Sequence, residues 1–436
     1  MLLRFKISNF LSFGEEVVFD MFPNPKRRKF MEHINHNNDI PLLSLAAIYG
    51  ANGSGKSNFI KAFNFLKHFV LYQNWIEIIG QEQYIDSLCF QLRKEKKKGI
   101  NFSIEFLYKN EYYLYTTKIE LKNIYEKLEK GLENNRQIIY ERNGCELKTS
   151  ENNSFDKNLS KRILNENKSS SFISLNKQFP FLKENFSINN VYNFFNSNLC
   201  VLGINTNIED LIGIYSKSKE LLCFAQKILQ HIGNETEKLS IREVPLEVYL
   251  ENRSDYLGKG IKESIPDTYE FVIDRAPIFR KETDQKTKTI KIKELLFQQL
   301  GKNGYKQKMN INTQSSGTIK LLHIIPILYS ITTQEKIAII DEIDNSIHPL
   351  LIKELIRYFY SFNPKGQLIF TTHTTQLLDQ QNLLRPDEIW ITEKKEGNTQ
   401  MYSLNDFKLH NTTEIEHGYL DGRYGGVPYI REFNFN

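Results

Sequence analysis

The chain has 436 residues, of which 40% are hydrophobic and 25% charged, as is typical of a soluble globular protein of two or three folded units. A net charge of +5 is too small to argue by itself for a nucleic-acid or acidic-protein partner. No apolar run is long enough to span a membrane, and the first residues lack the cleavage site of a secretion signal. The scattered cysteines, without paired spacing, fit a reducing compartment, so we expect a cytoplasmic protein with no membrane partner.

Two short strands are predicted at the start of the chain. Leu3, Phe5 and Ile7 alternate with charged residues, and a second apolar run begins at Val17 after a turn. The basic run at residues 26–29 follows in a polar segment. Such a run usually forms a solvated loop, and contact with phosphate or nucleic acid is the alternative.

A glycine-rich stretch then occupies residues 50–57 and reads Gly-Ala-Asn-Gly-Ser-Gly-Lys-Ser. It matches the phosphate-loop pattern, and it lies between an apolar run that predicts a buried strand, residues 45–49, and a stretch with helical spacing. Because the motif requires this strand–loop–helix context, a chance glycine-rich turn is disfavoured. Backbone N–H groups and the helix N-terminus would hold phosphates, Lys56 would reach the outer ones, and the Ser57 hydroxyl would ligate magnesium. The predicted cofactor-binding residues here are Asn52, Gly53, Ser54, Gly55, Lys56 and Ser57.

The middle of the chain gives weaker signals. Alternating apolar residues predict a β-meander over 100–142, and polar residues over 131–170 predict irregular connections with short helices. Residues 205–235 carry apolar side chains at helical spacing, which predicts a helical lid or arm. The lysine-rich stretch at 286–293, within the mixed segment 240–312, predicts a solvated β-hairpin.

Three short apolar strands separated by helical stretches follow, at residues 336–340, 368–372 and 388–391. This alternation predicts an α/β fold with a parallel sheet wound by helices.

Two carboxylates, Asp341 and Glu342, end the first of these strands. Downstream of a phosphate loop, such a pair can serve ATP chemistry. Asp341 would hold the magnesium shell, and Glu342 would polarise a water molecule beside the terminal phosphate. Two ordinary surface carboxylates at a strand end are the alternative.

Two further candidates remain open on the residues alone. Residues 314–318, Gln-Ser-Ser-Gly-Thr, precede a predicted helix and form either an anion site or a plain helix cap. His373 follows the second apolar strand and either hydrogen-bonds a terminal phosphate or is satisfied at the sheet edge. Its position after the Asp-Glu strand favours the phosphate.

The order of these elements resembles the ATPase heads of the ABC superfamily. The segments are GANGSGKS, SSGT, IIDEID, IHP and FTTHT, and the opening ISNFLSF adds to the likeness. They are most similar to the branch that contains the structural-maintenance-of-chromosomes proteins and the overcoming-lysogenization-defect nucleases. Within it, DEIDNSIHP and the tail GRYGGVP resemble stand-alone AAA-family ATPases of bacterial abortive-infection and phage-defence operons. The resemblance covers about residues 1–70, 85–125 and 310–436.

The resemblance implies an ABC-type ATPase head, with a β-meander subdomain, a parallel sheet wound by helices and a helical insertion. The N-terminal half of the head would span residues 1–150, the insertion 151–240, and the C-terminal half 241–436.

Residue by residue, the resemblance implies that Asp341 is the magnesium-shell aspartate, Glu342 the catalytic base and His373 the switch histidine. Ser315 and Gly317 stand at the signature positions that contact the γ-phosphate bound by a second subunit. The signature departs from Leu-Ser-Gly-Gly-Gln, which weakens this assignment.

The resemblance also places residues 345–348 in a loop that crosses the dimer interface. The magnesium-sensing glutamine of the family has no clear counterpart, and Gln91 is the candidate metal ligand.

ATP and Mg²⁺ are therefore the expected cofactors, with ATP joining two heads into a homodimer or higher homo-oligomer until hydrolysis at Glu342 releases them. We expect a sensor or scaffold that controls a separate effector, a nuclease or toxin, in anti-phage defence. Too few residues follow His373 for a nuclease domain of roughly a hundred residues. The lysine-rich stretches at residues 26–29, 94–98 and 286–293 motivate the alternative, a DNA-binding or DNA-clamping ATPase of the repair type. A transporter subunit is disfavoured.

Overall fold

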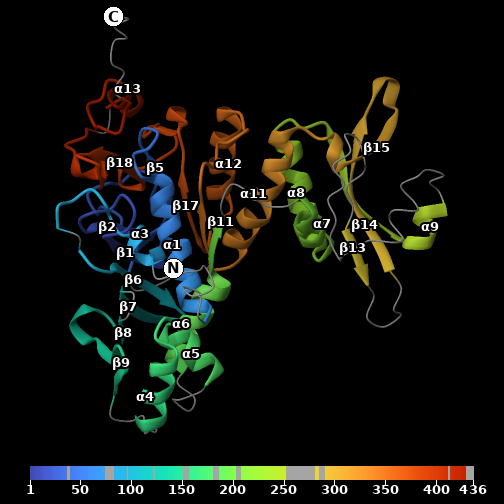
Figure 1. Ribbon diagram of the computed structural model, residues 1–436. Helices are drawn as coiled ribbons and strands as arrows, with labels where there is room; N and C mark the ends of the chain where they lie inside the picture. Colours follow the sequence, from blue (N-terminus) through green and yellow to red (C-terminus); the bar gives the residue numbers. More distant parts are fainter. Residues whose placement is uncertain are drawn as a thin grey trace, which may run out of the picture. The chain divides into compact units, whose positions relative to one another are not determined.

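The structure is a computed structural model that describes residues 1–36, 40–73, 83–95, 97–120, 123–150, 157–179, 186–202, 208–251, 280–283, 290–410 and 413–428 (Figure 1). The chain divides into two compact units. The first unit comprises Met1–Leu202, Ile331–Ile343 and Ile356–Asn436, and the second comprises Gly203–Ser330 and Asp344–Leu355. Among the described residues, none of the helices has the length and apolar character needed to cross a membrane.

The first unit contains a seven-stranded antiparallel sheet in the order β10-β9-β8-β7-β6-β1-β2. Its strands are β1 (Leu2–Ser8), β2 (Val17–Asp20), β6 (Ile100–Tyr108), β7 (Glu111–Ile119), β8 (Ile124–Lys130), β9 (Gln137–Asn143) and β10 (Glu146–Thr149). The two N-terminal strands and the meander are confirmed. The predicted meander ran to residue 142 and so covers most of β9, whereas the irregular connection expected over 131–170 is wrong where β10 forms a hairpin with β9. The short helices expected in that segment are confirmed by α4 (Lys157–Glu166). Both strands keep several side chains exposed, so their sequence shows little apolar alternation.

The same unit contains a six-stranded sheet in the order β11-β16-β17-β5-β18-β19, parallel except for the edge strand β19. Its strands are β5 (Leu45–Tyr49), β11 (Leu199–Leu202), β16 (Ile337–Ile340), β17 (Gln367–Thr371), β18 (Ile389–Lys395) and β19 (Asn398–Ser403). Every residue of β5, β16 and β17 is buried, as the continuous apolar runs predict for a covered parallel sheet. The predicted α/β fold with a helix-wound parallel sheet is confirmed, whereas the edge strand β11 was not predicted.

Helix α1 (Lys56–Leu71) follows the phosphate loop and packs against the antiparallel sheet. The ring of Phe63 stacks on that of Phe5 in β1 with centroids 3.9 Å apart, and the Phe59 ring meets Phe5 edge-on at 5.9 Å. Full burial of each such ring contributes about 1.5–3 kcal/mol of hydrophobic stabilisation. The start of α1, where the loop ends, is thereby held by a packed aromatic core.

A buried glutamine connects the two sheets. The Gln367 side chain of β17 accepts a hydrogen bond from the Leu2 N–H at 2.5 Å and donates to the carbonyls of Leu2 and Leu43 at 3.0 and 3.1 Å. The remaining elements of this unit include two short strands and five helices: β3 (Ile34–Asn35), β4 (Leu42–Leu43), α3 (Gln83–Leu88), α4 (Lys157–Glu166), α5 (Phe172–Gln178), α6 (Phe186–Asn193) and α13 (Ile415–Leu420).

The second unit holds the predicted helical stretch and a further antiparallel sheet (Figure 1). Its elements are α7 (Ile208–Ser216), α8 (Lys219–His231), α9 (Leu246–Glu251), β12 (Thr236–Pro245), β13 (Arg280–Thr283), β14 (Ile290–Leu300) and β15 (Lys306–Asn310). Helices α11 (Ser316–Thr333) and α12 (Pro349–Ser361) belong partly to each unit. The lysine-rich stretch enters β14, which pairs with β12, β13 and β15, while residues 284–289 lie outside the described residues. A β-structure was expected there, but β14 is the central strand of a sheet and not one arm of an isolated hairpin.

Candidate functional site

The phosphate loop has a backbone that ordinary side chains rarely adopt. Gly50, Gly53 and Gly55 have φ angles of +152°, +77° and +116°. A Cβ atom on Gly50 would collide with Thr392, and one on Gly55 with Thr399. Glycine is therefore required at these two positions for both conformation and space. The loop ends at the first turn of α1, whose unpaired N–H groups and dipole attract anions.

Lys56 lies folded back over this loop. Its side chain is buried, and Nζ donates to the carbonyl oxygens of Gly50 at 2.7 Å and Ala51 at 3.2 Å. Two of the three donors of the ammonium group are thus engaged by the backbone of the loop itself. Asn52 and Gly53 at the tip of the loop are exposed, and Ser57 is half-buried at the second residue of α1.

Ser54 is an anchor of the loop. Its buried hydroxyl hydrogen-bonds the Thr392 hydroxyl of β18 at 2.7 Å, and its carbonyl accepts from the Thr399 hydroxyl of β19 at 2.8 Å. Thr392 also donates to the carbonyl of Tyr49 at the end of β5. Sequence reasoning missed both threonines, because a threonine in a strand fits ordinary β-propensity and nothing nearby marks a partner more than three hundred residues away.

The two predicted carboxylates lie at the end of β16 and are fixed by one threonine. Asp341 is buried, and its Oδ1 accepts a hydrogen bond from the Thr371 hydroxyl at 2.6 Å. The N–H of Glu342 donates to the same hydroxyl oxygen at 2.7 Å, and Glu342 has a φ of +47°. A left-handed glutamate costs on the order of 1–3 kcal/mol, and such strain clusters at functional sites. Thr371 was not predicted, although its position at the end of a neighbouring strand was the available signal.

The sheet order brings the predicted groups to one edge. Strand β17 lies between β16, which ends at Asp341, and β5, which leads into the phosphate loop. All three strands are parallel, so their carboxyl ends lie at the same edge, where ligands of open α/β sheets bind. His373, two residues beyond β17, is exposed at that edge.

A hollow of about 600 Å³ opens over the phosphate loop. Its lining combines loop residues 50–54 with His373, the end of β18 and the C-terminal segment around Tyr419 and Gly426. The structure thus brings His373 together with Asn52, Gly53 and Ser54. Asp341 and Glu342 reach the same sheet edge but do not line this hollow.

The signature residues lie at the start of α11 in the second unit. The Ser315 hydroxyl accepts a hydrogen bond from the Thr318 N–H at 3.1 Å, so within one copy of the chain it caps the helix. A Cβ on Gly317 would lie 2.7 Å from the Ser346 carbonyl oxygen, which requires a glycine where the signature turn meets the loop at residues 345–348. Ser315 and Ser346 are exposed. Contact with a nucleotide held by a second copy stays a prediction.

Gln91 follows helix α3. Its side-chain amide donates to the carbonyls of Asp86 at 2.6 Å and Cys89 at 2.8 Å. The amide nitrogen is therefore engaged by local backbone, which leaves the side-chain oxygen as the atom a metal would require. The metal role of Gln91 stays a prediction.

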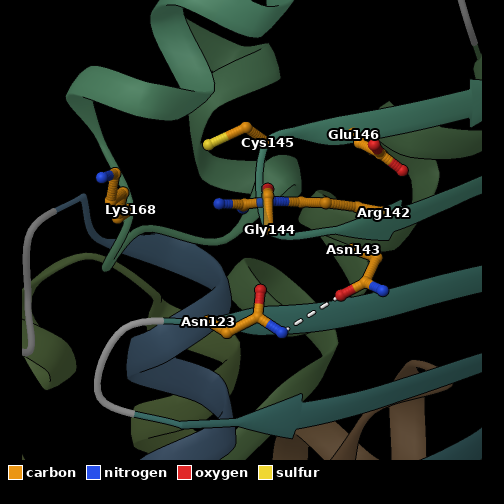
Figure 2. A pocket seen from close by; sticks show the side chains of 7 residues that line it. All are labelled: Asn123, Arg142, Asn143, Gly144, Cys145, Glu146 and Lys168. Carbon is orange, nitrogen blue, oxygen red and sulfur yellow. Dashed lines mark hydrogen bonds between the residues drawn. The ribbon is translucent and has the colours of Figure 1, made fainter.

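A second hollow, of about 400 Å³, lies beside the β9–β10 turn (Figure 2). Lys168 lies on one side of it, and the Arg142 side chain runs beneath Gly144. The guanidinium group donates to the carbonyls of Gly144 and Ser170 and to Glu126 Oε2 at 3.0 Å, with both charged side chains fully buried. Burial raises the pKa of Glu126, while Arg142 opposes that rise. Because this cation is already paired, we interpret the second hollow as structural.

Comparison with known proteins places residues 45–379 in the sequence pattern of a family described as "AAA domain, putative AbiEii toxin, Type IV TA system". No curated protein matches the sequence. Similar solved structures include an Smc head bound to the C-winged helix domain of ScpA, 13% identical over 92% of this chain and 97% of that one, with a TM-score of 0.43. The SMC head domain from Thermotoga maritima is 10% identical over 92% and 98%, with a TM-score of 0.42. A Pyrococcus furiosus Smc head bound to the C-terminal domain of ScpA is 13% identical over 92% and 96%, with a TM-score of 0.38.

Proposed function

This chain belongs to that AAA-domain family, and from this premise we propose that it is an ATP-binding and ATP-hydrolysing switch. One observation carries the proposal. A phosphate loop shaped by glycines with positive φ and a threonine-fixed pair of carboxylates occupy the same edge of the parallel sheet. The loop provides glycine backbone, a helix N-terminus and Lys56 for a polyphosphate, and the carboxylates provide the groups that phosphoryl transfer to water requires.

The donor atoms at this edge fit magnesium. Mg²⁺ prefers hard oxygen ligands and is usually held by one or two protein groups together with substrate phosphates. The Ser57 hydroxyl and the Asp341 carboxylate would be those groups. The ion would neutralise charge on the phosphates. Glu342 would then orient a water molecule for attack, and His373 would hydrogen-bond the terminal phosphate from the neighbouring strand end.

We further propose that two copies close over shared ATP. Ser315 is exposed at the start of α11, beside the exposed loop at residues 345–348, so these groups are accessible to a second copy. ATP would stabilise a homodimer, or a higher homo-oligomer, and hydrolysis at Glu342 would release it. A cycle of this kind is a two-state switch whose populations are set by the nucleotide.

The switch would act as a sensor or scaffold for a separate effector, a nuclease or toxin, in bacterial anti-phage defence. The family description, which names a toxin system, supports an effector of this class. Incubating the purified protein with Mg²⁺ and plasmid DNA tests whether the nuclease activity belongs to a separate protein. Rapid cleavage by the protein alone, lost on substitution of its own acidic residues, would contradict it.

DNA clamping is the second candidate, and the lysine pairing weakens it. Lys291 Nζ lies 2.8 Å from a Glu243 carboxylate oxygen, and Lys97 Nζ lies 3.2 Å from one of Glu15. In the run at residues 26–29, Lys29 donates to a glutamine side chain. Lys97 and Lys291 are therefore paired with carboxylates of the same chain, whereas the glutamine leaves the charge of Lys29 unchanged. A salt-sensitive, ATP-dependent gel shift with duplex DNA would favour clamping.

The decisive experiment compares the wild type with Glu342→Gln. Glutamine has nearly the same shape as glutamate but cannot act as a base. We therefore expect ATP binding to persist and steady-state hydrolysis to fall at least about 100-fold. An ATP-dependent dimer should accumulate. Light scattering after size exclusion and phosphate release provide the readouts. Hydrolysis by Glu342→Gln at the wild-type rate would overturn the assignment of the base.

A further inference from the structure

The C-terminal segment of residues 419–428, called here the C-terminal turn, lies against the phosphate loop. Tyr419 and Gly426 line the same hollow as the loop. A Cβ placed on Gly426, which has a φ of +70°, would lie 3.5 Å from Gly50 Cα and 2.6 Å from the Ile391 side chain. The left-handed φ and the contact with Ile391 require a glycine here, and the turn then lies in van der Waals contact with the first residue of the loop.

One phenolic oxygen holds the turn against the loop. The Tyr419 hydroxyl donates to the Gly426 carbonyl at 3.0 Å and so holds the glycine that packs on Gly50. The Tyr419 ring packs edge-on against Tyr49, the last residue of β5, with centroids 5.8 Å apart. Burial raises the pKa of Tyr419 to about 12, so the hydroxyl keeps its proton in neutral solution and can donate.

Gly50 therefore lies between the C-terminal turn and Lys56. Gly426 of the turn packs close to its Cα, and its carbonyl oxygen accepts a hydrogen bond from Lys56 Nζ at 2.7 Å. A shift of Gly50 would thus also move the lysine that would bind the outer phosphates. The turn is held further by a hydrogen bond from the Tyr402 hydroxyl to the Tyr424 carbonyl at 2.9 Å.

We propose that Tyr419 is a positioning residue for nucleotide binding, which holds Gly426 against Gly50 and couples the order of the C-terminal turn to occupancy of the phosphate loop. The inference rests on the proposed function, because it requires that the loop bind a nucleotide. The coupling is reciprocal by linkage. If an ordered turn strengthens nucleotide binding, a bound nucleotide orders the turn by the same factor.

Tyr419→Phe tests the first half of the inference, since it removes the oxygen and keeps the ring against Tyr49. Loss of one buried hydrogen-bonding atom predicts about 3- to 10-fold weaker binding of a non-hydrolysable ATP analogue. We expect KM for ATP to rise by the same factor while kcat changes less than about twofold, because Tyr419 does not approach the carboxylates. Tyr72→Phe, at a half-exposed tyrosine outside the hollow, is the matched control and should bind as the wild type does.

Limited trypsin digestion tests the second half. Arg423 lies in the turn with 68% of its side chain exposed, so cleavage after it reports opening of this segment. We expect the ATP analogue to slow this cleavage at least about threefold in the wild type and Tyr72→Phe, and to leave it nearly unchanged in Tyr419→Phe, as judged by mass spectrometry of the released C-terminal peptide.

The possible outcomes separate this inference from the proposed function. A wild type that binds no nucleotide removes the proposed function itself. A wild type that binds the analogue, with Tyr419→Phe binding equally well and cleavage at Arg423 insensitive to nucleotide, overturns only the role of Tyr419. If Tyr419→Phe is too unstable to assay, Gly426→Ala perturbs the contact between the C-terminal turn and Gly50 instead. This variant should weaken nucleotide binding to a similar extent, and normal binding by it would also overturn the inference.

Discussion

Thr371 donates its hydroxyl proton to Asp341 Oδ1 at 2.6 Å, from the end of the neighbouring strand. The same hydroxyl oxygen accepts a hydrogen bond from the Glu342 N–H. Thr371 therefore fixes the carboxylate of Asp341, which is proposed to bind magnesium, and the backbone of Glu342, which is proposed as the base. The hydroxyl is buried, which makes the hydrogen bonds strong and leaves no water to replace them.

Thr371→Val tests this arrangement, because valine keeps the shape and removes the hydroxyl. Leaving Asp341 Oδ1 and the Glu342 N–H without their partner should cost about 1–3 kcal/mol of stability. We expect kcat for ATP hydrolysis to fall roughly 10- to 100-fold through misplacement of Glu342, with ATP affinity changed less than about threefold. Thr371→Ser restores the hydroxyl and should recover most of kcat. A valine variant with normal turnover would show that the hydroxyl has no positioning role.

Two glycines of the phosphate loop provide a matched pair. Gly55→Ala places a methyl group against Thr399 at a φ of +116°, whereas Gly53→Ala, at a φ of +77°, meets nothing within 4 Å. The strain of the left-handed backbone alone costs about 1–2 kcal/mol, so Gly53→Ala should lower the unfolding midpoint modestly and Gly55→Ala clearly more. Thermal unfolding followed by circular dichroism measures both. Equal shifts would mean that the contact with Thr399 is easily relieved.

The residues that sequence reasoning placed well share one property, which is that their signal is local. The phosphate loop is a continuous motif between a strand and a helix, and Asp341 and Glu342 directly follow an apolar run. The groups that hold them come from elsewhere. Thr392 and Thr399 are each more than three hundred residues from the loop in sequence, and the pairing of β5 with β18 and of β18 with β19 brings them near it. Tyr419, which is equally distant in sequence, reaches the same hollow from helix α13.

The missed hairpin has a different cause. Strands β9 and β10 are polar and partly exposed, so period-two alternation is weak, yet Asn143-Gly144 stands at their turn and Gly144 has a φ of +59°. Because Asn143 pairs with Glu146, the two residues between the strands are Gly144 and Cys145. A glycine at the first position of a two-residue loop is a hairpin signal and could have identified them. The edge strand β11, with four residues, is too short to stand out from the helical stretch before it.

The buried pair Glu126–Arg142 predicts a pH-dependent defect. Both side chains are fully buried, and Arg142→Met leaves Glu126 without its cation, which should cost about 3–5 kcal/mol near pH 8. Burial raises the pKa of Glu126, and Arg142 is the first group that lowers it, so the variant shifts this pKa further upward. A raised carboxyl pKa favours the folded state at acid pH, and that contribution disappears as the pH rises through the folded-state pKa. The defect of Arg142→Met should therefore shrink toward pH 5.

Urea unfolding at pH 5, 6.5 and 8 measures this effect. Adding Glu126→Gln to Arg142→Met removes the buried charge, so the double variant should lose the pH dependence and recover part of the stability. Arg162→Met, in an ion pair whose partners are 78% and 58% exposed, is the control and should change stability by less than about 0.5 kcal/mol. A defect that grows toward pH 5 would mean that Glu126 is not the titrating group.

Gly317→Ala tests the proposed contact between two copies. The added methyl group would lie 2.7 Å from the Ser346 carbonyl oxygen, so either the signature turn or the loop at residues 345–348 must shift. The phosphate loop is formed by other residues, so one copy should still bind ATP with affinity changed less than about twofold.

If the signature turn completes the site of a second copy, ATP-dependent dimerisation in the Glu342→Gln background should weaken at least about tenfold, measured by sedimentation velocity across protein concentrations. Ser361→Ala, at an exposed serine outside the signature turn and outside residues 345–348, is the control and should dimerise normally. An unaffected Gly317→Ala dimer would place the ATP-dependent interface elsewhere on the molecule.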